Sequence, residues 1–85
     1  MRPTFSMLQD VISVEPRADN TLLLVFENSE RRRFDMKPLL KRKPFCRLKN
    51  SPLFMKATVA LGTVVWPGNI DIDPETLWEE SVRES

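Results

Sequence analysis

The sequence predicts an α+β protein in which an antiparallel sheet is built from two hairpin units and a C-terminal helix packs on it. Three observations predict this class. Residues 11–36 hold β-rich stretches joined by short polar turns, residues 57–66 hold a second β-rich pair around Gly62, and an Asp-Pro-Glu helix start follows at residues 73–75. Connections this short join antiparallel strands, whereas a parallel sheet needs long crossovers. The predicted order is three strands, a short helix, two strands and a helix.

The first two strands follow from apolar alternation and turn chemistry. Residues 11–15 are β-rich and are followed by "PRADN", in which Pro fixes φ and Asp19 and Asn20 offer side-chain bonds to the backbone. The next stretch, "TLLLVFE", is apolar on both faces, with Leu23 and Val25 on the face opposite Leu22, Leu24 and Phe26. We therefore expect it to be the central strand of its sheet.

The third strand is expected in "ERRRFDM", after a tight hairpin at Asn28 and Ser29. Arg32, Phe34 and Met36 share one face of this strand, and the alternate residues share the other. Because those alternate residues are charged, the second face must be exposed to water. After it, "KPLLKRK" is long enough for a single helical turn, which Pro44 ends.

A short helix and a second hairpin are expected next. Asn50 or Ser51 can cap a helix that has Pro52 in its first turn and that ends before Thr58. In "KATVALGTVVWP" two β-rich arms surround Leu61-Gly62, where glycine permits the backbone of a two-residue turn.

The C-terminal helix is expected from about residue 74 to residue 82. Asp73 can serve as its N-cap, with Pro74 at the first helical position and Glu75 in the first turn, where the helix dipole favours negative charge. Its buried stripe is expected to hold Leu77, Trp78 and Val82, and Trp66 and Trp78 are expected to form the contact between hairpin and helix. The alternating acids Asp71, Asp73 and Glu75 could also suggest a cation site, but capping accounts for Asp73 and Glu75 and no further ligands are in view.

The composition indicates one small globular domain over residues 1–85. Apolar residues make up 41% and charged residues 29%, values typical of folded soluble proteins. The N-terminus lacks the continuous apolar core of a signal peptide, and no stretch is long and apolar enough to span a membrane, so a cytoplasmic protein is expected. With no His and one Cys, the chain cannot form a Cys/His zinc site or an internal disulfide.

The sequence offers no catalytic apparatus. It has no His for acid–base work near neutral pH, no Gly-rich phosphate loop and no nucleophile elbow. We therefore expect no enzyme activity, no catalytic residue, no cofactor and no metal.

The charges are segregated along the chain although the net charge is +1. Residues 31–49 hold nine Lys or Arg and one acid, a net charge of +8, while residues 71–85 hold six acids and Arg83, a net charge of −5. Such blocks can face each other or form contact surfaces for a partner.

The chain contains "LLLVFEN", "RRRFDM", an Arg-Leu pair separated by five residues from a Phe (Arg47 to Phe54), and the closing "WPGNIDIDPETL". In these motifs it resembles a small bacterial family of unknown function, number 2442. The resemblance covers about residues 11–78. It implies a compact α+β fold and a cytoplasmic protein, often encoded beside a toxin-like small protein, which suggests an antitoxin-like role. Some family members are fused to a helix-turn-helix segment. Residues 1–85 show no such segment, so we do not expect a DNA-binding role on that ground.

The function expected from these features is protein–protein interaction with a small, toxin-like protein. The segregated charge and the absence of catalytic residues both favour it, and the oligomeric state is left open. The alternative is a regulatory protein that binds nucleic acid through the basic region 31–49. In either case the expected contacts are basic side chains: Arg31, Arg33, Lys41, Arg42 and Lys43.

Overall fold

The computed structural model describes residues 9–84. Within these residues there are two antiparallel sheets, three short 3-10 helices and one α-helix, so the predicted α+β class is confirmed. The arrangement differs from the single sheet that the sequence predicts, because the two hairpin units form separate sheets. Residues 1–8, on which the expectation of a cytoplasmic protein partly depends, lie outside the described residues.

Sheet A contains four strands in the order β1-β2-β3-β7. They are β1 (Val11–Pro16), β2 (Thr21–Phe26), β3 (Arg31–Asp35) and β7 (Val82–Arg83). β2 is central, as its apolar residues on both faces predict, and it is almost entirely buried. β7 was not predicted: two residues of the C-terminal segment pair with Arg32 and Arg33 and close the free edge of β3.

The turns of sheet A use polar residues to reverse the chain. Asp19 accepts hydrogen bonds from the backbone N–H of Thr21 at 3.2 Å and from its hydroxyl at 2.6 Å. The hydroxyl bond lowers the pKa of Asp19 by more than burial of the carboxylate raises it. In the next turn Ser29 donates to the carbonyl of Phe26 and adopts a φ of +70°, so this hairpin has a bulged connection in place of the tight two-residue turn.

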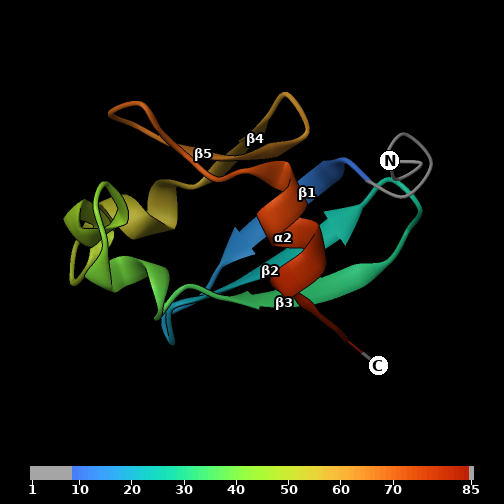
Figure 1. Cartoon of the computed structure of the whole chain (residues 1–85), viewed down its shortest axis with the longest axis horizontal. Helices are drawn as coiled ribbons and strands as arrows, with labels where there is room; N and C mark the ends of the chain where they lie inside the picture. Colours follow the sequence, from blue (N-terminus) through green and yellow to red (C-terminus); the bar gives the residue numbers. More distant parts are fainter. Residues whose placement is uncertain (1–8, 85) are drawn as a thin grey trace, which may run out of the picture.

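The chain between the sheets forms three 3-10 helices: η1 (Leu39–Lys41), η2 (Phe45–Leu48) and η3 (Pro52–Lys56). Each begins at a proline or directly after one, and none extends beyond five residues. The Ser51 hydroxyl caps η3 by accepting from the N–H of Leu53 at 3.1 Å, as predicted. These turns form one end of the molecule, drawn in green and yellow in Figure 1.

Sheet B contains β4 (Thr58–Ala60), β5 (Thr63–Trp66) and β6 (Ile70–Asp71), in that order. The predicted hairpin is confirmed: Leu61 and Gly62 both have positive φ, as a primed two-residue turn requires. β6 was not predicted, because a pair of residues is too short to show alternation.

The helix α2 (Pro74–Glu80) begins where the sequence predicts and ends earlier than expected. The Asp73 carboxylate accepts from the N–H of Glu75 at 3.0 Å, which confirms the cap. The expected position of Val82 in the buried stripe is wrong, since it lies in β7 and is 58% exposed. The chain turns to extended backbone at Ser81 and pairs with β3 instead of continuing the helix.

The core lies between one face of sheet A, sheet B and α2, which crosses in front of β2 and β3 in Figure 1. Leu22, Leu24, Phe26 and Phe34 supply the sheet A side of the core. The two tryptophans have separate roles. Trp66 is buried against η3, whereas Trp78 is half-buried and packs edge-on against Phe26 at 4.9 Å between ring centroids.

Candidate interaction surface

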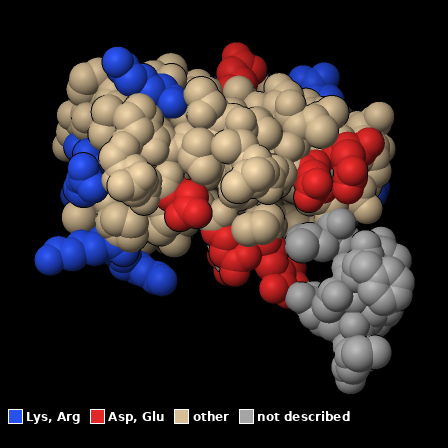
Figure 2. Space-filling model, turned by 90° about the horizontal axis from the view of Figure 1, so that it is seen from above, with Lys and Arg blue, Asp and Glu red and all other residues tan. Residues whose placement is uncertain are grey.

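The basic residues of the 3-10 helices lie on the surface, as charged side chains without buried partners do, and prolines keep these helices short. Between residues 36 and 70 the chain has seven Lys or Arg and no Asp or Glu. Lys41, Arg42 and Lys43 are all exposed at the η1–η2 connection. In Figure 2 the visible basic side chains gather mainly at the end of the molecule that carries these turns, while acidic side chains lie nearer the middle and the other end.

Most of these basic residues have no acidic partner in the described part of the chain. Lys37 lies 3.8 Å from Asp35, the one ion pair within 4 Å that involves this group and residues 9–84. Arg47 donates to the carbonyl of Gly68 at 3.5 Å. We call Lys41, Arg42, Lys43 and Lys49 the basic end.

The five residues expected to bind a partner do not form one cluster. Lys41, Arg42 and Lys43 lie in the basic end, beyond the last residue of β3. Arg31 is the first residue of β3, about 13 Å from the last residue of that strand at the usual rise per residue. Arg31 and Arg33 instead lie on the solvent-facing side of sheet A, where alternation predicts them.

A shallow hollow of about 270 Å³ lies where the end of β3, the η1–η2 connection and α2 meet. Its lining includes apolar side chains such as Phe34 and Phe45, together with Arg42, Asp73 and Glu80. Arg42 is therefore close to acidic residues without forming an ion pair to them within 4 Å in the described chain. The hollow borders the basic end at Arg42, and its lining residues show no arrangement of groups typical of catalysis.

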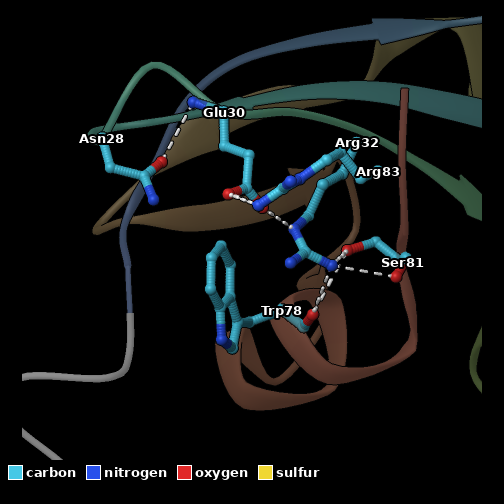
Figure 3. A network of polar contacts seen from close by, with 6 residues as sticks. All are labelled: Asn28, Glu30, Arg32, Trp78, Ser81 and Arg83. Carbon is cyan, nitrogen blue, oxygen red and sulfur yellow. Dashed lines mark hydrogen bonds and ion pairs between the residues drawn. The ribbon is translucent and has the colours of Figure 1, made fainter. Parts of the chain in front are cut away.

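Arg32 faces inward and belongs to a polar network that the sequence did not predict (Figure 3). Its Nε donates to Glu30 Oε1 at 2.6 Å and its Nη1 donates to the carbonyl of Ser81 at 3.0 Å. Its guanidinium carbon lies 4.1 Å from the centre of the Trp78 ring, a cation–π distance. Arg83 binds the second oxygen of Glu30 at 2.9 Å. The network joins the C-terminal segment to β3.

Glu30 responds to two opposing influences. Burial of its carboxylate raises the pKa. Hydrogen bonds from Arg83 and Arg32 together lower it by more, so the pKa lies below its ordinary value of 4.5. A carboxyl whose pKa is depressed by folding contributes stability above its unfolded pKa, and this stability is lost as the pH falls through the folded value.

We therefore expect a pH-dependent contribution to stability from Glu30. The melting temperature of the wild type should fall as the pH drops below about 4.5. Glu30→Gln should melt lower than wild type at neutral pH, and the difference should shrink on acidification. Thermal unfolding between about pH 7 and about pH 3 measures this. Glu80→Gln, an exposed substitution outside the network, should keep the wild-type dependence; a constant deficit in Glu30→Gln at all pH values would contradict the assignment.

No helix within residues 9–84 is long and apolar enough to cross a membrane. Comparison with curated proteins and with solved structures gave no match. A family model described as "Protein of unknown function (DUF2442)" matches residues 11–83, nearly the whole chain. The resemblance of the hairpin and closing motifs is thereby confirmed, and the chain belongs to the DUF2442 family.

Proposed function

We propose that this protein is an interaction module that binds an acidic surface of another small protein through its basic end. In this proposal the partner is the toxin-like protein that the family resemblance suggests, and the role is antitoxin-like. No catalytic step is involved; binding alone is the function.

The observation that supports the proposal is the uncompensated charge of the η1–η2 connection. Lys41, Arg42 and Lys43 are consecutive, exposed and without an ion pair to an acid of residues 9–84. Adjacent like charges repel one another, and an acidic partner surface relieves that repulsion while accelerating encounter at low salt. The short 3-10 helices hold these side chains on a defined backbone. Less conformational entropy is therefore lost on binding.

A nucleic acid would relieve the same repulsion, so charge by itself does not separate the two partners. Single-stranded nucleic acids are usually bound by exposed aromatic rings on which bases stack. In the described chain Phe26, Phe34, Phe54 and Trp66 are buried. The rings of Phe45 and Trp78 are half-buried and packed against other rings. This absence of stacking platforms among residues 9–84 favours a protein partner.

The test is to isolate the untagged protein from its host and to compare what co-purifies with wild type and with Lys41→Glu/Lys43→Glu. We expect one stoichiometric protein partner with wild type and an affinity reduced at least about tenfold in the double variant, with a steep dependence on salt. Lys41→Arg/Lys43→Arg, which keeps both charges, should bind as wild type does.

A titration with duplex DNA and with single-stranded RNA distinguishes the alternative. Binding weaker than about 10⁻⁴ M at physiological salt is the result expected for a protein-interaction module. Micromolar binding to either nucleic acid, lost in Lys41→Glu/Lys43→Glu and accompanied by no protein partner, would replace the proposal with the nucleic-acid function.

A further inference from the structure

The face of sheet A that points away from the core is here called the outer face. Strand alternation places Leu23 and Val25 of β2 on it, because Leu22 and Leu24 point into the core. The core cluster contains no residue of the outer face. Leu23 is nevertheless only 7% exposed. Val82, next to Arg33 across β3 and β7, is 58% exposed on the same face.

The register of the strands arranges charges on this face in rows. Glu15, Leu23 and Arg33 pair with one another across β1, β2 and β3, so the middle row has an acid on one side of an apolar residue and a base on the other. All of the charged side chains in this row are exposed.

The adjacent row has the reverse order of charge. Arg17, directly after β1, donates its N–H to the carbonyl of Thr21, and Thr21 pairs with Asp35. The row therefore reads base, neutral residue, acid. On the other side of the middle row, Ser13, Val25 and Arg31 pair across the same strands.

We propose that the outer face of sheet A is a self-complementary surface through which two copies of this chain associate face to face. A two-fold axis that runs along β2, between the two sheets, places β1 of each copy over β3 of the other. Glu15 then faces Arg33 of the second copy, and Arg17 faces Asp35 of the second copy. Symmetry repeats both pairs, and Leu23 and Val25 meet their own counterparts in the centre.

The charges also disfavour one alternative way of stacking the sheets. A two-fold axis at right angles to the strands, in the plane between the sheets and passing through the middle row, would place Glu15 over Glu15 and Arg33 over Arg33 of the second copy. Like charges in contact oppose that arrangement. The axis along β2 avoids these like-charge contacts and brings Leu23 and Val25 onto their counterparts, and it gives the aligned packing, with an angle near 30°, that is common for twisted sheets.

The ion pairs that these residues form within one copy are long and exposed. Arg17 lies 3.9 Å from Glu15, Arg33 lies 3.7 Å from Glu84, and Lys37 lies 3.8 Å from Asp35. Surface pairs of this kind contribute little to stability, so exchanging them for pairs across the interface costs little. Because a face of four short strands is small, we expect a weak dimer, with a dissociation constant between about 10 μM and about 1 mM.

The inference goes beyond the proposed function and is independent of it. Lys41 and Lys43 lie outside the outer face, so the partner-binding variant Lys41→Glu/Lys43→Glu should associate with itself as wild type does. Arg31 and Arg33, which the sequence suggested as partner contacts, belong to self-association in this inference.

The test is sedimentation equilibrium of the full chain from about 10 μM to about 1 mM at low and at high salt. Wild type should form dimers that weaken as salt rises. Glu15→Arg and Arg33→Glu should each remain monomeric, because each opposes like charges twice across the interface. Circular dichroism establishes that each variant is folded.

The decisive arm mixes the two single variants. In a mixed dimer Arg at position 15 of one copy faces Glu at position 33 of the other, and Arg33 of the first copy faces Glu15 of the second. The mixture should therefore dimerise although neither component does. A wild type that stays monomeric at all concentrations, or a dimer that survives each charge reversal unchanged, or folded variants that fail to pair on mixing, would overturn the proposal.

Discussion

Replacing Trp66 with alanine is expected to lower the free energy of unfolding by about 3 to 5 kcal/mol. The side chain is 3% exposed, and its ring is stacked on Phe54 at 6.3 Å and lies edge-on to Phe45 at 6.4 Å between centroids. Its Nε1 donates to the carbonyl of Phe54 at 3.0 Å. Alanine would leave a cavity between sheet B and the 3-10 helices and an unpaired carbonyl in it.

This loss is a large fraction of the stability of a domain of this size, about 4 to 13 kcal/mol. Urea unfolding followed by far-ultraviolet circular dichroism measures it without relying on the deleted fluorophore. The control, Trp66→Phe, keeps an aromatic ring and loses the hydrogen bond, so its cost should be smaller, about 1 to 3 kcal/mol. A loss below about 1 kcal/mol in Trp66→Ala would show that this ring is not central to the core.

Replacing Arg32 with methionine is expected to cost about 2 kcal/mol, mainly through the bond that the guanidinium donates to the carbonyl of Ser81. Methionine keeps a long side chain over Trp78 but supplies no donor, so the buried Ser81 loses its partner on β3. The effect should be greatest near the C-terminus, since the network joins residues 78–83 to β3.

Hydrogen exchange of the Glu84 amide, which donates to the carbonyl of Arg31 at 2.8 Å, reports on this local effect. Its protection should fall in Arg32→Met by more than the global loss of stability explains. Arg31→Met, on the exposed neighbouring position of the same strand, serves as the matched control and should leave that protection nearly unchanged. Equal effects in the two variants would contradict the special role of Arg32.

Much of the local structure follows from the sequence because its causes are local. Alternation assigns Phe34 to the core and Arg33 to solvent whatever lies across the sheet. The start of α2 at Pro74 and the turn at Leu61-Gly62 depend on the conformations that a few adjacent residues permit. Elements with local causes were therefore predicted close to their observed positions.

The division into two sheets could not be predicted in the same way. Alternation states which face a residue occupies but not which strand lies beside it, so the two hairpins were placed in one sheet. β6 and β7 have two residues each, and two residues carry no periodicity. They form because the edge strands β5 and β3 have free backbone N–H and C=O groups with which these two-residue segments pair.

The fate of Val82 illustrates the same limit. A helical period placed it in the buried stripe of α2, but pairing with β3 draws the chain away from the helix after Glu80. The carbonyl of Ser81 is bound by Arg32, a residue 49 positions earlier, which local reasoning cannot foresee.

The sequence by itself determined the amount and sign of charge: a strongly basic region after residue 30 and an acidic region near the C-terminus. The tertiary structure alone decided which of those charges meet. It pairs Arg32 with Glu30 in the interior of the network, leaves Lys41 and Lys43 on the basic end, and places Glu15 and Arg33 on either side of Leu23. Charge is a property of the residues in any conformation. The energy of an ion pair depends on the distance between the charges and on their burial, and both are set only when the strands have adopted their register.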